Sequence, residues 1–583
     1  MQPRLLPLAA AALAAAATSA ARPLLGAEFT SVPAATSDLT PVAEGGWTVA
    51  TGSARAPSAA LRAGDRPAAV DADGWPTEDA YLIFFIATPD TEDLAQFVPR
   101  HTYGAFALSF VGKAAAVELD PRINATVSGL SFDAATWTTT ATVTLGPPLP
   151  GLAIGFAGTQ RSADAPPGSG VTRVRLLQPG VAPAGPAPPL FTPDAVAAVA
   201  PFFAHVRFME FTQGDMIVGF ANASSPGLGI AVEWADRTLL SDALWGRARA
   251  KSFGAPWEAV VLFAQAARVG VWVCVPAQAS DDYVRELALL LRDGSELTGG
   301  SGVPGAIYLE HSNEVWLNGS AAANGGPSAA YLYNRAAATA EVAANASSIL
   351  NIDGVDDPEI WAYRRHLRRV AEIGAIFVAV FEGQADRVRP VLGWCQNFER
   401  ELEGLGAWWT AALAPRFGPV GSALYGVAVN AYSVGGVAPG ATEADIVAAV
   451  RAASDAQRPA RAATAALAAQ GGLRFMTYEG ALVCIPVMRD APTTSAIIEA
   501  NRREAWAAAV RYDYEANWAQ IAGAAEFNFF ALASRYGEDF PIGRFQWGLT
   551  EDISNTTTPK FGAVRAILGG GGAAGQAEEG DYQ

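Results

Sequence analysis

The feature that most constrains the fold is a repeated alternation of short apolar runs and helical stretches after about residue 170. Near-continuous apolar runs of this length are typical of strands in a parallel sheet that is covered on both faces. Eight of them recur, at 171–177, 205–211, 270–276, 306–312, 388–394, 424–432, 473–479 and 525–533. Helical stretches lie between several of them, for example at 257–267, 281–292, 362–373 and 443–453. The pattern predicts a (β/α)8 barrel over residues 170–568.

An open, doubly wound α/β sheet is the alternative arrangement for such a pattern. Open sheets that bind dinucleotides carry a G-x-G-x-x-G sequence after the first strand. No such sequence follows the run at 171–177. The closed barrel is therefore the fold that we expect.

The part of the chain before the barrel has a different pattern of predicted elements. Five β-prone runs separated by turn signals lie between residues 80 and 158, and they predict a small β-sandwich domain over 66–165. Residues 22–65 are rich in Ala, Ser, Thr and Pro without a sustained period, which predicts a linker or a disordered segment. Residues 569–583 are of low complexity and predict a flexible tail.

The first 21 residues have the organisation of a signal peptide. Arg4 precedes the apolar run 5–17, and small residues suited to cleavage follow it. The apolar run at 373–381 is too short for a transmembrane span. We therefore expect a protein that is secreted, extracellular or in the cell wall. Five N-x-S/T sequons are compatible with that route, at Asn124, Asn222, Asn318, Asn345 and Asn555.

Composition excludes several classes of protein. The chain has 57 acidic and 40 basic residues, a formal charge of −17, and 51% apolar residues. Disordered chains are less apolar and more charged, and nucleic-acid binding requires a basic face. With three cysteines and four histidines, neither a disulfide scaffold nor a His/Cys zinc site is expected.

Candidate site residues lie where the predicted strands end, because the active site of a barrel is at the C-terminal ends of its strands. Two of them are glutamates, Glu314 after the fourth strand and Glu479 in the seventh. Amide, aromatic and basic side chains nearby are suited to bind a sugar, through stacking on its C–H face and hydrogen bonds to its hydroxyls. The candidates for substrate binding are Arg207, Trp234, Gln278, Asn313, Trp316, Asn430, Tyr432 and Asn528.

The two glutamates fit glycoside hydrolysis. That reaction needs one protonated carboxyl group for the leaving oxygen and one ionised carboxylate that attacks the anomeric carbon or activates water. Glu314 is the expected acid and Glu479 the expected nucleophile. Tyr432 would hydrogen-bond the nucleophile, and Arg207 would keep it ionised by lowering its pKa.

These residues resemble clan A of the glycoside hydrolases, which is similar in having a (β/α)8 barrel, an Asn-Glu acid/base after strand four and a Glu nucleophile after strand seven. The matching residues here are Asn313-Glu314 and Glu479. A second resemblance is to a group of secreted, largely uncharacterised proteins described as cellulose-binding or hydrolase-like. The sequence motifs of that group are similar to DADGWP (71–76), RFMEF (207–211), WADR (234–237), DDYVREL (281–287), YLEHSNEVW (308–316), NAYSVGG (430–436) and TYEG (477–480) in this chain.

The resemblance implies retaining hydrolysis of a β-linked polysaccharide, with no metal or cofactor. The chain departs from the expected pattern at Gln278 and Asn430, where histidines would stand, and at Ala481, where a second glycine would follow TYEG. A non-catalytic carbohydrate-binding or cell-surface protein on the same barrel is an alternative, and a transglycosylase is another.

Structural roles are the competing interpretation for several candidates. Glu314 could complement a helix dipole, and Arg207 could be a structural ion-pair partner of Glu210 or of a neighbouring residue. Asn430, Tyr432 and Asn528 could satisfy backbone groups at strand ends. The tryptophans could belong to the core.

Overall fold

The computed structural model describes most of the chain. The described residues are 24–29, 40, 47–49, 65–85, 103–121, 123–147, 151–181, 189–245, 254–319, 326–488, 490–523, 526–534, 536 and 546–569. The predicted signal peptide, most of the predicted linker and nearly all of the predicted tail lie outside them.

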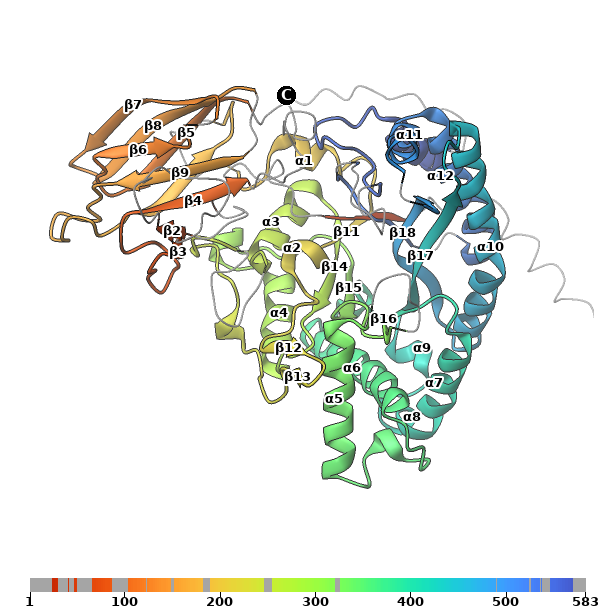
Figure 1. The fold of residues 1–583 in the computed structure, drawn as a ribbon. Helices are drawn as coiled ribbons and strands as arrows, with labels where there is room; N and C mark the ends of the chain where they lie inside the picture. The colour runs from red at the N-terminus through yellow and green to blue at the C-terminus, as the bar shows by residue number, and fades with distance from the viewer. Residues whose placement is uncertain are drawn as a thin grey trace, which may run out of the picture.

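A closed barrel of eight parallel strands forms the larger part of the molecule, as the sequence predicts (Figure 1). Each strand pairs with its neighbours in the order of the chain, and the last pairs with the first. The strands are β1 (Leu25–Glu28), β11 (His205–Arg207), β14 (Gly270–Val275), β15 (Ile307–His311), β16 (Val388–Trp394), β17 (Gly426–Val437), β18 (Arg474–Pro486) and β19 (Phe527–Phe529).

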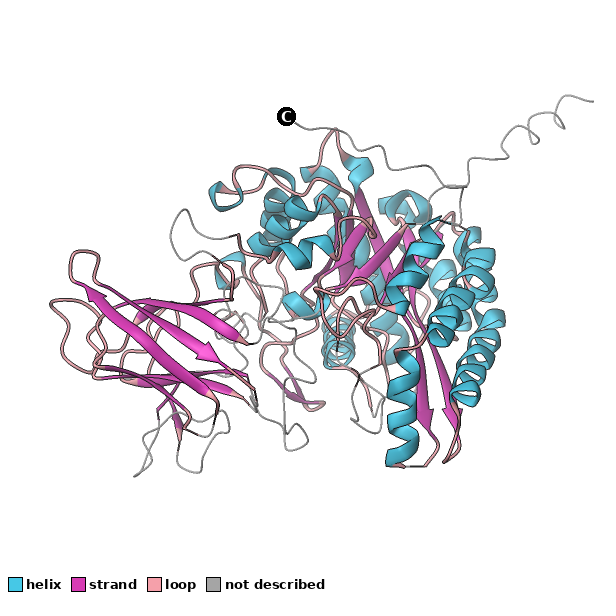
Figure 2. Cartoon of the chain, turned by 90° about the horizontal axis from the view of Figure 1, so that it is seen from above, coloured by secondary structure: helices cyan, strands magenta, loops and turns pink. Residues whose placement is uncertain are grey.

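Helices surround the barrel on its outside (Figure 2). Most strands are followed by at least one of them, so that both faces of the sheet are buried. The longer helices are α3 (Trp257–Ala267), α4 (Asp281–Asp293), α5 (Ala329–Ala344), α6 (Pro358–Val380), α7 (Glu399–Ala412), α10 (Glu443–Gln470), α11 (Ala491–Asn501), α12 (Glu504–Asn517) and α14 (Pro559–Gly569). The short ones are α1 (Pro193–Ala197), α2 (Met209–Thr212), α8 (Ala414–Phe417), α9 (Val420–Ala423) and α13 (Ala519–Ala522).

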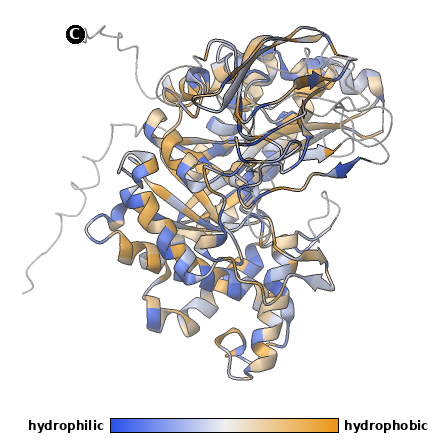
Figure 3. Ribbon diagram, turned by 90° about the vertical axis from the view of Figure 1, so that its left-hand side faces the viewer, coloured by the Kyte–Doolittle hydropathy of each residue, from blue (hydrophilic) through white to orange (hydrophobic). Residues whose placement is uncertain are grey.

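These helices carry both apolar and polar residues, as expected for elements with one face on the barrel and one in solvent (Figure 3). The apolar run 373–381 lies almost wholly in α6, where Ile373 and Phe377 are buried. None of the helices that the structure describes is long and apolar enough to cross a membrane.

Two antiparallel sheets form the β-sandwich beside the barrel (Figure 1). One sheet has the order β10 (Thr172–Leu177), β5 (Gly104–Val111), β8 (Thr138–Leu145) and β7 (Ala125–Asp133). The other has the order β3 (Arg66–Pro67), β2 (Trp47–Val49), β4 (Ala80–Phe85), β9 (Leu152–Ala157) and β6 (Ala116–Leu119). Ala243 and Leu244 pack into the sandwich core, and the amide of Ala243 donates to the carbonyl of Asp73.

The structure corrects the predicted first strand. The run at 171–177 is β10 of the sandwich, and the barrel begins with β1, in the segment predicted to be a linker. Part of that segment also supplies β2. A four-residue strand is too short to show a period, and β1 is separated from β11 by the whole sandwich. The sandwich is therefore an insertion after the first barrel strand.

Strands β17 and β18 extend past the barrel. Their pairing continues in register to Val437 and Pro486, well after their last pairings with β16 and β19. Helices α10, α11 and α12 cover one face of this extension with a separate apolar cluster that includes Ile446, Leu482 and Trp506. The extension leads outward from the ends of strands six and seven, where candidate site residues lie.

A substitution in β1 tests whether this strand belongs to the barrel. A Cβ atom at Gly26 would lie 1.8 Å from Asn528 Oδ1 and 2.4 Å from His205 Nε2. We expect Gly26→Ala to lower the free energy of unfolding by about 2–3 kcal/mol, as measured by urea denaturation. Gly404→Ala is the control, because the Cβ there meets nothing within 4 Å and alanine favours a helix. An unchanged stability in Gly26→Ala would contradict the assignment of β1.

Candidate active site

One arginine at the centre of the barrel mouth organises the site. Arg207, at the end of β11, is fully buried and donates five hydrogen bonds to four side chains. Its Nη1 donates to Glu479 Oε1 at 2.7 Å and to Glu28 Oε2 at 3.2 Å. Its Nε and Nη2 donate to Glu310 Oε2, and Nη2 also donates to Asn313 Oδ1 at 2.7 Å. A planar guanidinium with five N–H groups suits such a set of acceptors.

A bulge in β18 aims Glu479 at this arginine. Val429 of β17 pairs with Thr477, and the next residue, Asn430, pairs with Glu479, so Tyr478 is the extra residue. Consecutive strand residues normally point to opposite faces, and a bulge changes that. The Thr477 hydroxyl donates to the carbonyl of Val429 or of Glu479, each at 2.7 Å, and accepts from the amide of Glu479. Tyr478 and Glu479 thus both reach the barrel mouth.

Glu479 has a second donor at its other oxygen. The phenol of Tyr432, in β17, donates to Glu479 Oε2 at 2.8 Å. Arg207 and Tyr432 together hold both oxygens of the carboxylate, which fixes its plane. One of these donors is a cation, and charge-assisted hydrogen bonds of this kind are stronger than neutral ones.

Glu314 reaches the same place from the end of β15. Ser312 and Glu314 have left-handed backbone conformations, with φ of 56° and 48°, and Asn313 lies between them. Such conformations are costly for residues other than glycine and occur often at functional sites. They turn the chain sharply so that Asn313 contacts Arg207 and Glu314 contacts Tyr478, whose phenol lies 3.3 Å from Glu314 Oε1.

The two glutamates have different electrostatic surroundings. Burial and, after it, the negative charge of nearby Glu479 together raise the pKa of Glu314 to about 8, although Arg207 and Tyr478 oppose the shift. Glu314 makes no ion pair among the described residues, whereas Glu479 is paired with Arg207. Two carboxyl groups in unlike environments can divide the roles of acid and base.

Two further carboxyl groups lie at the mouth. Burial, followed by the charges of Glu479 and Asp215, raises the pKa of Glu210 to about 7, although Arg207 opposes the shift. Burial also raises the pKa of Asp215. The amide of Glu210 donates to Glu28 Oε1 at 2.9 Å, which links the first turn after β11 to β1. The proposed pairing of Glu210 with Arg207 is replaced by the pairs with Glu28, Glu310 and Glu479.

Three of the predicted substrate-binding residues have structural contacts instead. Gln278 is buried, and its amide group bonds to the backbone of Val218 and Gly227, so it fixes the loop after α2. Trp234 stacks its ring on Arg237 at 4.2 Å and packs against Tyr283. Asn528 is fully buried in the layer of Gly26 and His205, one layer below Arg207.

Trp316 and Asn430 lie close to the site but face other groups. Trp316 is 1% exposed, which leaves no face for a sugar, and its indole N–H donates to the phenol of Tyr478 at 3.1 Å. Asn430 is partly exposed beside Glu479 in the register of β17 and β18, and its side-chain oxygen accepts from the amide of Gln396 at 3.3 Å. Strand-end position alone could not separate these contacts from substrate contacts.

Sequence reasoning missed Glu28, Glu310 and Tyr478 as parts of the site. Glu28 lies in the segment 22–65, which the sequence predicts to be a linker, so it was not considered as a site residue. Glu310 lies inside the predicted strand 306–312 and not at its end, so the rule of strand ends does not select it. The two-residue period of β15 nevertheless places Tyr308 and Glu310 on the same face. Its Oε2 also accepts from the indole of Trp272 at 2.9 Å. Tyr478 would point away from the mouth in a regular strand, and only the bulge reverses this.

Aromatic rings line the mouth beside Glu479. Tyr432, Phe530 and Trp547 pack on one another, with ring centroids 5.0 Å apart for Phe530 and Trp547 and 6.0 Å apart for Tyr432 and Trp547. We call these three residues the aromatic wall. Trp547 and Tyr432 are only partly buried. A partly exposed aromatic surface next to a carboxylate is suited to a sugar ring.

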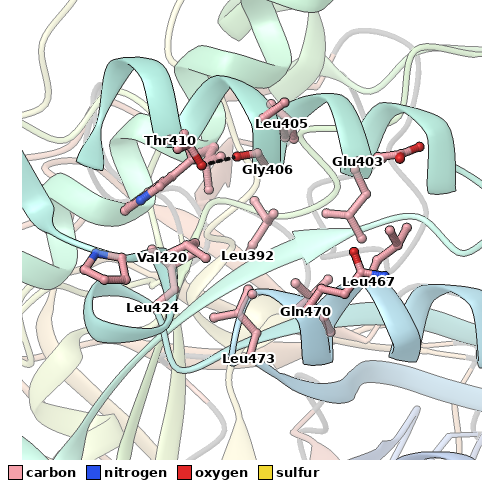
Figure 4. Close-up of a pocket in the computed structure, with 18 of the residues that line it drawn as sticks. Leu392, Glu403, Leu405, Gly406, Thr410, Val420, Leu424, Leu467, Gln470 and Leu473 are labelled. Carbon is pink, nitrogen blue, oxygen red and sulfur yellow. Dashed lines mark hydrogen bonds between the residues drawn. The ribbon is translucent and has the colours of Figure 1, made fainter. Parts of the chain in front are cut away.

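A large apolar cavity lies elsewhere. It has a volume of about 660 Å³ and lies between α7, α10 and the starts of neighbouring strands (Figure 4). Leu392, Leu405 and Leu467 are among its lining residues, and none of the carboxyl groups that contact Arg207 reaches it. The chemistry is therefore assigned to the barrel mouth. Among the described residues, no group of three His, Cys, Asp or Glu side chains is arranged to hold a metal ion.

Fold and site together define a (β/α)8-barrel protein with a buried arginine, two unlike carboxyl groups and an aromatic wall at the mouth. No protein-family model matches the chain, and no curated protein matches it.

The similar solved structures include glycoside hydrolases. One is the GH51 arabinofuranosidase from Xanthomonas axonopodis pv. citri, with 10% identity, a TM-score of 0.36 and coverage of 64% of each chain. Others are GH10 from Paenibacillus barcinonensis, with 12% identity, a TM-score of 0.32 and coverage of 64% of this chain and 91% of that one, and xylanase 10B from Thermotoga maritima, with 10% identity, a TM-score of 0.30 and coverage of 64% and 89%. This chain thus spans less than two thirds of the arabinofuranosidase. Residue roles here come from the chain's own geometry.

Removal of one charge tests whether the two glutamates interact. In Glu479→Gln the negative charge that raises the pKa of Glu314 is absent, so we expect that pKa to fall from about 8. It should remain above 4.5, because burial is the larger cause. Carboxyl ¹³C NMR titration measures it. Glu286→Gln, at an exposed position of α4, is the control and should leave the titration of Glu314 unchanged. No change in Glu479→Gln would mean that the two groups do not interact.

Proposed function

We propose that this protein is a glycoside hydrolase that cleaves a β-linked polysaccharide with retention of configuration. The observation that carries the proposal is the division between the two glutamates. Arg207 and Tyr432 hold Glu479, whereas Glu314 forms no ion pair among the described residues and has its pKa raised to about 8. Those are the states that an attacking carboxylate and a proton donor need.

The first step forms a covalent intermediate. Glu479 Oε attacks the anomeric carbon, the bond from that carbon to the leaving oxygen breaks, and Glu314 gives its proton to that oxygen. As the negative charge of Glu479 is lost, Arg207 keeps its ion pairs with Glu28 and Glu310. The positive charge of Arg207 therefore stays paired with carboxylates throughout the step.

The second step releases the sugar. Glu314, now ionised, takes a proton from water, and the water oxygen attacks the anomeric carbon and displaces Glu479. Tyr432 donates again to the free carboxylate. Two displacements at one carbon return the original configuration.

The substrate class is supported by the surroundings of Glu479. The aromatic wall offers ring faces for the C–H face of a sugar, and Asn313 is fixed by Arg207 next to Glu314. The similar structures include a xylanase and an arabinofuranosidase. A polysaccharide substrate agrees with these surroundings of Glu479 and with the similar structures. A transglycosylase would use the same intermediate with a sugar acceptor in place of water.

Secretion belongs to the same proposal. Four of the five predicted glycosylation sites, Asn124, Asn222, Asn345 and Asn555, are exposed. The amide nitrogen of Asn318, the atom that would carry a glycan, donates to Glu359 Oε1 at 3.0 Å. The amide nitrogen of Asn124 likewise donates to the carbonyl of Pro147 at 2.7 Å. A secreted form is therefore expected to carry glycans at Asn222, Asn345 and Asn555 in preference to Asn124 and Asn318.

Loss and rescue of turnover test the assigned roles. Glu479→Gln should lower kcat for a panel of aryl and polymeric β-glycosides by about 10³-fold or more, because no glycosyl-enzyme forms. Glu314→Ala should still form the glycosyl-enzyme from substrates with an activated leaving group but hydrolyse it slowly, and azide should restore the rate with a β-glycosyl azide as product. Proton NMR of the first product reports its configuration.

Glu286→Gln is the matched control and should hydrolyse at the wild-type rate. If the wild-type protein binds glycans and turns over none of the panel, the barrel is a carbohydrate-binding scaffold. A first product with inverted anomeric configuration would instead mean that Glu479 acts as the base that takes a proton from the attacking water.

The rate should depend on pH through Glu314. Its protonated form is the proton donor and is present below about pH 8, so kcat/KM for an unactivated substrate should fall as the pH rises through about 8. In Glu314→Ala with a dinitrophenyl glycoside that alkaline fall should be absent. A wild-type alkaline fall near pH 5 would contradict a raised pKa for this group.

A further inference from the structure

The segment Gln546–Gly548 carries one residue of the aromatic wall and is held from several directions. The Gln546 side chain accepts from the amide of Cys484 at 3.1 Å and donates to its carbonyl at 2.7 Å, so it is tied to the edge of β18. The amide of Gly548 donates to Ser534 Oγ at 2.9 Å. A Cβ at Gly548 would lie 2.5 Å from the amide nitrogen of Ser534, so only glycine permits this approach.

A buried lysine holds the same segment from behind. Lys560, in the first turn of α14, is 3% exposed. Its Nζ donates to the carbonyl of Gln546 at 2.6 Å and to that of Gly548 at 3.1 Å, on both sides of Trp547. The ring centroid of Tyr536 is 4.3 Å from Nζ, and the Tyr536 hydroxyl donates to the carbonyl of Gly548 at 2.7 Å.

This use of a lysine is unusual for the chain. Lys560 is one of three lysines among 40 basic residues, the rest being arginines. Burial lowers its pKa well below the usual value, and the negative charge of Glu551 only partly opposes this. Among the residues that the structure describes, no carboxylate forms an ion pair with it. A buried Nζ costs free energy, but it can donate two or more hydrogen bonds from a compact group, which a planar guanidinium cannot do in the same space.

Trp547 connects this anchor to the nucleophile. Its ring packs on Phe530 and Tyr432, and the Tyr432 phenol donates to Glu479 Oε2. A shift of the segment would move Trp547 away from Tyr432 and open the aromatic wall. The two backbone carbonyls that flank Trp547 are the groups that Lys560 binds.

We propose that Lys560 is a positioning residue that holds Trp547 in the aromatic wall beside Glu479, and so fixes the surface on which the substrate sugar stacks. The part of this proposal that concerns sugar stacking depends on the proposed function. The part that concerns the position of Trp547 does not.

The position of Trp547 is tested first, without any substrate. The chain is labelled with 5-fluorotryptophan, and the ¹⁹F resonance of Trp547 is assigned as the one that Trp547→Phe removes. We expect Lys560→Met, which keeps the apolar stem and removes both donors, to shift or broaden this resonance and to leave most of the others in place. Lys113→Met, at an exposed position of the sandwich, should leave it unchanged. An unmoved Trp547 resonance in folded Lys560→Met would overturn the proposal.

A kinetic cycle then tests the effect on the site. A misplacement of about 1 Å can cost on the order of 10²-fold in rate, so we expect Lys560→Met to lower kcat/KM by about 10–100-fold. The rise in KM should exceed the fall in kcat, because stacking contributes mainly to binding. In a Trp547→Ala background, Lys560→Met should change kcat/KM by less than about two-fold, because the residue through which it acts is gone.

A purely structural role gives a different result. In that case Lys560→Met would cause the same loss of kcat/KM with and without Trp547, which would overturn the proposal. If Lys560→Met does not fold, Lys560→Gln, which keeps an N–H donor group on a shorter side chain, replaces it in both experiments with smaller expected changes in the same direction. If the wild type hydrolyses no glycoside, the proposed function fails, and the ¹⁹F measurement still decides the placement of Trp547.

Discussion

The structure depends on one buried guanidinium. Arg207 receives carboxylates from the first, fourth and seventh strands of the barrel, through Glu28, Glu310 and Glu479. Buried charges are costly unless they are paired and hydrogen-bonded, so these contacts have to form together. The pairing ties strands on different sides of the barrel to one point. It also means that the barrel and the candidate active site share their central interaction.

Around that point, small departures from regular backbone geometry decide what the site can do. The bulge at Tyr478 brings two consecutive residues of β18 to the mouth, one toward Glu314 and the other toward Arg207. The left-handed residues Ser312 and Glu314 do the same work at the end of β15. Each departure changes the direction in which the side chains at a strand end point. Without the bulge, Tyr478 and Glu479 would point to opposite faces of β18.

The sequence predicted the barrel because seven of its eight strands are apolar runs with helices between them, and those positions need only a period and a length. The same logic placed Glu314, Glu479, Asn313, Arg207 and Tyr432 at strand ends. It could not find β1, since four residues carry no period. It could not separate Gln278, Trp234 and Asn528 from residues that face the mouth, because a strand-end position does not specify the direction of a side chain. Tyr478 depended on a bulge that the hydrophobic pattern does not encode.

The insertion of the sandwich after β1 has a consequence for how the molecule is made. During synthesis, Leu25–Glu28 leaves the ribosome long before β11, and β19 comes near the other end of the chain. Both pairing edges of β1 therefore stay open while the sandwich, whose strands β2 to β10 all precede β11 in the chain, can already fold. Closure of the barrel waits for its last strand, and Glu28 remains apart from Arg207 until β1 has docked. A chain that is interrupted late would hold a folded sandwich on an unclosed barrel, with the apolar strand edges exposed to other chains.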